Sequence, residues 1–397
     1  MWSSATRGRS LSALILGLGM FLACKTASAP PPPPAATAAP PAPAAPTVPA
    51  ATAAVAAAAP TAANASPAPP PALPTSPRVA LKVGTVPFAT NAPFFIAQER
   101  GYFNEVGLDV EFSSFNSATQ QVPALAQGQL QAGSCASNAA CFNAFQRGTD
   151  IRIVADLTSA GKTERSTGSS ALVVRKDLYD DGTIREPADL VGRTVYLVPG
   201  PGSGDQPTVA LWLRRSGVDP ARVEWDGMGF PEQLAAMENH AIETGIQTEP
   251  LLTVGLGRGA HVVLATQEAM DPSAELLYLA YWSGIDRLGP MVGERFLVAY
   301  LRGARDYINA FEYGVDQDEI IDILTRETLL KDAAVYRQIK YSWVDPNGVV
   351  GQASLEARAQ VFRDLGVLTT PVDLAQALDD HYRNFAVGYL GEYRPPR

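Results

Sequence analysis

Two short polar side chains, Thr90 and Asn91, lie where the sequence predicts a turn between a strand and a helix. The preceding residues 79–86 alternate in character and are rich in Val, which predicts a strand, and residues 92–100 have a helical pattern. Backbone N–H groups and short polar side chains at such a turn can hydrogen-bond a small molecule. They can also cap the following helix, a role that is compatible with binding. We expect Thr90 and Asn91 to contact a small-molecule ligand.

A second group of short polar side chains, Ser134, Ser137 and Asn138, occupies the equivalent place at a later predicted strand. That strand is the short apolar segment 131–135, which ends at a polar turn. Helix capping and ligand contact are again both possible roles. We favour ligand contact for this group.

A glycine-rich segment and a carboxylate supply further candidate contacts. Ser203 and Gly204 end the segment 200–204, which opens a predicted helix, and glycine there lets a ligand approach exposed backbone amides. Glu249 begins a Glu-Pro pair at a predicted strand end. Its carboxylate can accept hydrogen bonds from an amino or imino group of a ligand, or it can serve as a helix N-terminal acid beside Pro250.

Trp282 is the remaining candidate for ligand contact. It ends the segment 276–282, after which the chain is predicted to be helical, and its ring could stack on a planar ligand or pack at a hinge.

The sequence offers little support for an enzyme, which is the principal rival class. His240, His261 and His381 are scattered, and neither a His-Glu-x-x-His motif, a paired Cys-x-x-Cys nor a Gly-x-Ser-x-Gly motif occurs. Gly161 to Thr163 do not form a phosphate-binding loop, because position 156 is Asp instead of Gly. We therefore expect no catalytic residues, no metal and no cofactor. The net charge of −9 also argues against nucleic acid as a partner.

Cys135 and Cys141 flank the polar turn that contains Ser137 and Asn138. Only some backbone geometries allow cysteines six residues apart near a strand-to-helix junction to pair. We favour two buried apolar thiols over a disulfide, which remains the alternative.

The N-terminal residues have the pattern of a targeting segment and a linker. Arg7 and Arg9 precede an apolar run, 11–22, that is too short to span a bilayer, so residues 1–23 are predicted to be a signal peptide. Ala23-Cys24 resembles a bacterial lipobox, in which the cysteine is lipidated, although Phe21 departs from the usual pattern. Cleavage near Ala27 or Ala29 is the alternative. Residues 24–79 are rich in Pro and Ala and are predicted to form a disordered linker.

The elements that must position the candidate residues alternate between strands and helices. Residues 80–397 exceed the size at which a single core keeps growing, which predicts two domains. Such alternation predicts mostly parallel sheets with a ligand crevice at the carboxyl ends of the strands. Beyond those given above, the predicted strands are 107–112, 170–175, 193–198, 223–229, 243–247 and 261–265, and the predicted C-terminal helices are 293–311, 317–328, 333–341, 352–364 and 371–386.

Several segments together resemble a known family, the periplasmic substrate-binding proteins of ABC importers for sulfonates, taurine, nitrate and thiamine-precursor pyrimidines, with riboflavin binders among their relatives. The segments that carry the resemblance are 93–103, 105–110, 124–133, 188–195, 249–250 and 295–307. Residues 241–248 depart from the family, which usually has an Asp shortly before the Glu-Pro pair.

The resemblance implies an α/β fold of the type II periplasmic-binding-protein class, a clamp of two lobes joined by two crossovers near Ser170 and Leu279. Residues 80–171 and 280–397 would form the first lobe and residues 172–279 the second. Such a protein is an extracytoplasmic monomer that captures a small organic nutrient by hinge closure and delivers it to an ABC permease. It would touch the membrane only through its lipid anchor.

The candidate residues bear on the ligand class. They include one carboxylate, Glu249, and no cation, whereas a small oxyanion would require Arg or Lys near the amides. We therefore favour a planar heterocycle, such as a thiamine-precursor pyrimidine or a flavin, over a sulfonate, taurine or nitrate. Lys162 or Arg165 would reverse this choice if either entered the cleft.

Overall fold

The computed structural model describes residues 72–168 and 170–397. The predicted signal peptide, Cys24 and most of the predicted linker lie outside the described residues. Within the described part of the chain, no helix has both the length and the apolar character needed to cross a membrane.

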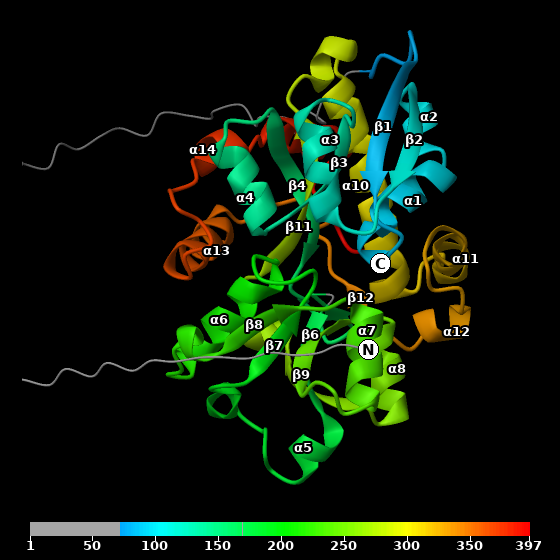
Figure 1. Ribbon diagram of the computed structural model, residues 1–397. Coiled ribbons are helices and arrows are strands. Elements are labelled where there is room, and N and C mark those ends of the chain that lie inside the picture. Colours follow the sequence, from blue (N-terminus) through cyan, green and yellow to red (C-terminus); the bar gives the residue numbers. More distant parts are fainter. Residues whose placement is uncertain (1–71, 169) are drawn as a thin grey trace, which may run out of the picture. The chain divides into compact units, whose positions relative to one another are not determined.

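Five strands form the first sheet, in the spatial order β2-β1-β3-β11-β4 (Figure 1). They are β1 (Val79–Thr85), β2 (Leu108–Ser114), β3 (Ala132–Ala136), β4 (Ile151–Ser159) and β11 (Glu275–Trp282). β1 is parallel to β2 and β3, whereas β11 is antiparallel to β3 and β4. In β1, Val79, Leu81 and Val83 are buried, and Ala80 and Lys82 between them are exposed, as expected for a strand covered on one face.

Five further strands form the second sheet, in the order β10-β6-β9-β7-β8. They are β6 (Ser170–Arg175), β7 (Thr194–Leu197), β8 (Glu224–Gly227), β9 (Thr244–Thr248) and β10 (His261–Thr266). β7 is parallel to β8 and β9, whereas β6 is antiparallel to β9 and β10. Leu172, Val195 and Ile246 are fully buried in the core of this sheet.

The chain crosses from the first sheet to the second between β4 and β6 and returns between β10 and β11. Leu277 near the start of β11 pairs with Ala136 at the end of β3, and Ser170 at the start of β6 pairs with Thr248 at the end of β9. Both strands thus enter their sheets where parallel strands end, and they must run in the opposite direction. Each sheet is therefore mixed, because one strand, β11 or β6, runs opposite to the other four. Residues 275–279 belong to the first sheet, which corrects their predicted place in the second lobe.

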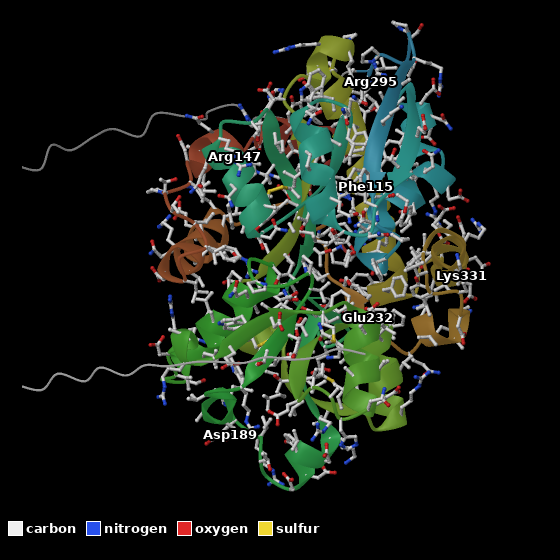
Figure 2. All side chains as sticks on the ribbon, viewed as in Figure 1. Phe115, Arg147, Asp189, Glu232, Arg295 and Lys331 are labelled. Carbon is white, nitrogen blue, oxygen red and sulfur yellow. A yellow bond between two sulfur atoms is a disulfide. The ribbon has the colours of Figure 1, made fainter. Side chains whose placement is uncertain are left out.

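Helices pack against both sheets and against each other. They are α1 (Ala92–Glu99), α2 (Tyr102–Glu105), α3 (Val122–Ala126), α4 (Ala139–Gln146), α5 (Lys176–Asp180), α6 (Asp205–Arg215), α7 (Phe230–Glu238), α8 (Leu251–Arg258), α9 (Gln267–Met270), α10 (Val292–Tyr313), α11 (Gln317–Glu327), α12 (Ala333–Tyr336), α13 (Gln352–Asp364), α14 (Leu374–Ala377) and α15 (His381–Leu390). Phe94 of α1 packs on Tyr300 of α10, with the ring centroids 5.3 Å apart. The buried Arg295 of α10, labelled in Figure 2, donates hydrogen bonds to the carbonyl oxygens of Val106 and Gly107. These contacts fix α10 against the first sheet.

Several elements differ from the sequence prediction. The strand β4 was missed, because every residue in it except Arg152 is buried and the alternation that marks a half-exposed strand is lacking. The predicted helix 333–341 ends at Tyr336, and Tyr341 instead pairs with Ser166 in a small sheet of β12 (Tyr341–Ser342) and β5 (Ser166–Thr167). The predicted helix 371–386 is divided into α14 and α15.

Candidate ligand-binding site

Loops from both sheets border a cavity of about 360 Å³. The first sheet contributes residues 88–90, 116–119, Ala136 and Asn138, and the second contributes residues 198–199, 203–205, 229–231 and 248–249. These segments follow β1, β2, β3, β7, β8 and β9, so the cavity lies at the carboxyl ends of those strands. This is the place where ligands bind in open α/β sheets.

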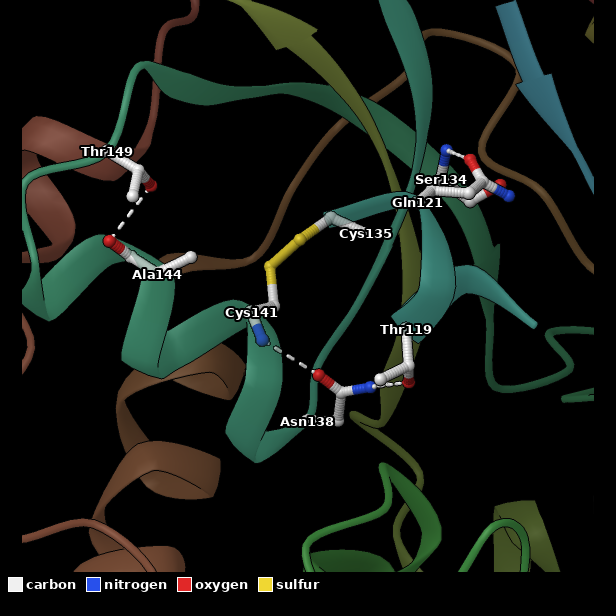
Figure 3. Close-up of a disulfide and its surroundings, with 8 residues drawn as sticks. All are labelled: Thr119, Gln121, Ser134, Cys135, Asn138, Cys141, Ala144 and Thr149. Atoms are coloured by element: carbon white, nitrogen blue, oxygen red, sulfur yellow. Dashed lines mark hydrogen bonds between the residues drawn. A yellow bond between two sulfur atoms is a disulfide. The ribbon is translucent and has the colours of Figure 1, made fainter. Parts of the chain in front are cut away.

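Asn138 is held firmly at the first-sheet side of the cavity (Figure 3). Its side-chain oxygen accepts a hydrogen bond from the backbone N–H of Cys141 at 2.9 Å and so caps α4. Its side-chain nitrogen donates to Thr119 Oγ1 at 2.8 Å. Asn138 therefore has the predicted capping role and also lines the cavity, while its contact with a ligand stays a prediction.

A disulfide joins Cys135 and Cys141 across this loop (Figure 3). The sequence prediction of two buried apolar thiols is therefore wrong. The chain turns back between the end of β3 and the first turn of α4, which brings the two Cα atoms to 6.1 Å, within the range that a disulfide spans. The covalent loop encloses Asn138.

Thr90 borders the cavity, but Asn91 and Ser134 lie behind its wall. Both side chains are completely buried. Asn91 Oδ1 accepts hydrogen bonds from the N–H of Val86 at 3.0 Å and from Ser134 Oγ at 3.2 Å. Asn91 and Ser134 therefore support the loops after β1 and β3, and the structure does not place them among the cavity-lining residues.

Ser203 and Gly204 line the second-sheet side of the cavity at the start of α6. Ser203 is 3% exposed, and its hydroxyl has no hydrogen-bond partner among the described residues. Asp205, which follows Gly204, accepts a hydrogen bond from Ser170 Oγ at 2.7 Å. Burial raises the pKa of Asp205, an effect that this hydrogen bond and the charge of Arg358 oppose.

Glu249 brings a second carboxylate to the cavity. Its two oxygens accept hydrogen bonds from the backbone N–H of Thr253 at 3.2 Å and from Thr253 Oγ1 at 3.0 Å. Burial nevertheless raises the pKa of Glu249 above its ordinary value. A carboxylate in this condition is poorly solvated, so a ligand N–H group would stabilise its charged form.

Ser137 and Trp282 do not line the cavity. Ser137 Oγ donates to the carbonyl of Glu275 at 2.8 Å and accepts a hydrogen bond from Arg358 Nε at 2.8 Å. Trp282 lies at the far end of β11, because this antiparallel strand begins at the cavity and runs away from it. Its ring packs close to Gly128 and Gly284, which corrects its predicted place beside a ligand.

Aromatic side chains form part of the cavity wall, and the sequence did not single them out. Phe311 of α10 stacks on Tyr341, with ring centroids 5.7 Å apart. Tyr341 donates to Glu312 Oε2 at 2.8 Å, and burial raises its pKa. The aromatic lining residues are Phe88, Phe230, Tyr307, Phe311, Tyr336 and Tyr341. They come from loops and C-terminal segments that carry no local binding motif.

The charged residues of the lining are Asp205, Glu249 and the exposed Lys340. Lys162 and Arg165, which could have reversed the ligand choice, do not line the cavity. Arg165 donates to the carbonyl oxygen of Glu312 at 2.9 Å, and Lys162 Nζ lies 3.4 Å from the carbonyl oxygen of Pro272. The lining is therefore aromatic and acidic, with one cation that solvent reaches.

A model of the NMT1-like family matches residues 75–274, about half of the chain. The riboflavin-binding protein RibY of Chloroflexus aurantiacus is 26% identical over 329 residues, which cover 78% of this chain and 87% of RibY.

Solved structures share the fold at lower sequence identity. The nitrate-binding protein NrtA of Synechocystis has a TM-score of 0.62 and 15% identity, over 79% of this chain and 90% of its own. The aliphatic sulphonate-binding protein SsuA of Escherichia coli has a TM-score of 0.60 and 16% identity, over 75% of this chain and 91% of its own.

These likenesses confirm the predicted fold class, an α/β periplasmic-binding-protein fold in which two crossovers join two sheets. The proteins with which the chain shares that fold bind small solutes, as their names state. The matched family model spans β1 to β10 and the cavity-lining loops of both sheets. The chain belongs to the NMT1-like family.

Proposed function

We propose that this chain is the extracytoplasmic solute-binding protein of an ABC importer. It captures a small organic nutrient between its two sheets as a monomer and delivers that nutrient to a permease. Support comes from the cavity at the strand ends and from relatives named for binding riboflavin, nitrate and sulfonate.

The ligand class that the cavity favours is a planar nitrogen heterocycle, either a thiamine-precursor pyrimidine or a flavin-like ring. The observation that carries this choice is the aromatic and acidic lining. Aromatic rings such as those of Phe88 and Phe230 offer stacking faces, and the carboxylates of Asp205 and Glu249 can accept hydrogen bonds from ring or amino N–H groups. The volume of about 360 Å³ falls within the usual range for small-molecule pockets.

A sulfonate, taurine or nitrate is the alternative ligand. One observation favours such an anion: α6 and α7 both begin at the cavity. Helix N-termini attract anions. Figure 2 shows Glu232, in the first turn of α7, at the end of that helix nearest the first sheet. The first turn of each helix thus already carries a carboxylate, Asp205 or Glu232, which disfavours a second negative charge.

The assignment as a binding protein instead of an enzyme predicts saturable binding without turnover. Riboflavin or the thiamine-precursor aminopyrimidine should raise the melting temperature of the purified protein, because a ligand at about a hundred times its Kd adds about 2.7 kcal/mol. Chromatography after long incubation should recover the compound unchanged. Conversion of the bound compound to a new product would show an enzyme on the same fold.

We further propose that a lipid on Cys24 holds the protein at the membrane after removal of residues 1–23. The Pro- and Ala-rich linker, residues 24–79, would connect this anchor to the binding protein. Replacing Cys24 by Ser should release the protein from the membrane fraction or leave it unprocessed. Fractionation and N-terminal mass spectrometry measure both outcomes. A variant that stays membrane-bound and is still trimmed to position 24 would contradict the proposal.

A further inference from the structure

Helix α13 carries an arginine on the face that packs into the protein. Leu355, Ala359 and Phe362 follow helical spacing and are buried in a cluster with Phe142 of α4, whose ring centroid lies 5.9 Å from that of Phe362. Arg358 lies on the same face and is completely buried. Arginine is almost never fully buried unless its charge is paired, so this position requires partners.

The partners of Arg358 belong to both sheets. Its Nε donates to Ser137 Oγ at 2.8 Å, in the loop after β3 of the first sheet. Its Nη1 donates to Thr208 Oγ1 at 3.0 Å, and its Nη2 donates to the carbonyl oxygen of Gly204, both in the second-sheet part of the chain. Nη1 also lies 3.5 Å from Asp271 Oδ2, in the segment that returns from the second sheet to the first. One guanidinium therefore connects the two halves.

The segment that Arg358 holds is part of the cavity wall. Gly204 and its neighbours Ser203 and Asp205 line the cavity. The backbone N–H of Ala139 donates to the carbonyl oxygen of Gly202 at 2.9 Å, so the loops after β3 and before α6 touch directly. Helices α13 and α6 lie next to each other in this region (Figure 1).

We propose that Arg358 is a latch that holds the two halves of the cavity in the ligand-binding arrangement. This inference rests on the proposed function, but it concerns a residue outside the cavity lining. Moving α6 away from α13 would strip a buried guanidinium of the bonds to Thr208 and Gly204. An unpaired buried charge is strongly unfavourable. Arg358 therefore disfavours separation of α6 from α13 until water replaces Thr208 and Gly204 as its hydrogen-bond partners. Arg358 is thus a positioning residue, because it acts through the loop that carries Ser203 and Gly204.

The test combines a distance measurement with a binding measurement. Spin labels on noncanonical amino acids at Lys82 of β1 and Glu224 of β8, both exposed, report the separation of the two sheets in the full chain. In the absence of ligand, Arg358→Met should shift the distance distribution toward longer values than in the wild type. Its affinity for riboflavin or the thiamine-precursor aminopyrimidine should fall about tenfold, because a smaller fraction of molecules is competent to bind.

Three further variants separate the latch from a loss of folding. Thr208→Val keeps the shape of its side chain but removes one acceptor, so it should give a smaller shift in the same direction. Arg358→Lys keeps the charge without the planar fork and should fall between the wild type and Arg358→Met. Arg214→Gln removes the partly exposed ion pair of α6 with Asp364 of α13 and is the matched control, because exposed pairs contribute little. It should resemble the wild type.

The failure of the latch and the failure of the proposed function have different signatures. Unchanged distances in folded Arg358→Met and Thr208→Val would overturn the latch, as would an equal shift in Arg214→Gln. A wild type that binds neither heterocycle would contradict the proposed ligand class, while the ligand-free distances would still test the latch.

Discussion

Replacing Glu249 by Gln is expected to weaken binding of the thiamine-precursor aminopyrimidine by roughly 10- to 100-fold, since hydrogen bonds to charged groups contribute about 1.5–3 kcal/mol. The carboxylate lines the cavity, and burial raises its pKa, so a ligand N–H donor would stabilise it. Gln keeps one oxygen, which can accept the hydrogen bond from the N–H of Thr253, and its amide group can donate to Thr253 Oγ1, so the loop should be preserved. Calorimetric titration of wild type and variant measures the change.

Glu243→Gln is the control for this prediction. Glu243 immediately precedes β9, the strand whose other end leads to Glu249, and it pairs with Arg193 outside the cavity lining. Its replacement should leave the affinity nearly unchanged. Equal losses in the two variants, or no loss in Glu249→Gln, would remove Glu249 from the site.

Replacing Glu275 by Gln is expected to flatten the pH dependence of stability. Burial raises the pKa of Glu275 from 4.5 to about 7, although the hydrogen bond from the N–H of Gly351 opposes this shift. The folded chain therefore holds a proton that the unfolded chain loses, and this contribution to stability is complete below about pH 4.5 and is lost as the pH rises through 7. The shift in pKa corresponds to a change of about 3 kcal/mol in the free energy of unfolding between low and high pH.

Denaturant unfolding at pH 5 and pH 8 tests this prediction. Gln resembles the protonated acid, so Glu275→Gln should match the wild type at pH 5 and exceed its free energy of unfolding at pH 8. Glu111→Gln, at an exposed position on β2, should follow the wild type at both pH values. The explanation fails if the difference between wild type and Glu275→Gln is the same at pH 5 and pH 8.

The sequence located the candidate site best where a strand ends at a polar turn. Thr90, Asn138, Ser203, Gly204 and Glu249 all border the cavity, because the carboxyl ends of the parallel strands meet there. Which side chain of a turn faces the cavity depends on local backbone geometry. The sequence pattern therefore did not distinguish Asn91, Ser134 and Ser137, which hold the loops from behind.

Other parts of the site depend on tertiary structure that local patterns do not contain. Trp282 was misplaced because the direction of its strand in the sheet cannot be read from the local sequence. Tyr336 and Tyr341 reach the cavity from a C-terminal segment far from the strand-end loops in sequence. Arg358 had a local signal, a charge on the apolar face of α13, but its partners on α6 could not be read from that signal.

Isothermal titration of the wild-type protein with riboflavin, the thiamine-precursor aminopyrimidine, taurine and nitrate tests the central claim most directly. The aromatic and acidic cavity predicts that one of the two heterocycles binds at a single site and that taurine and nitrate bind far more weakly. Tight binding of taurine or nitrate, with no response to either heterocycle, would contradict the proposed ligand class.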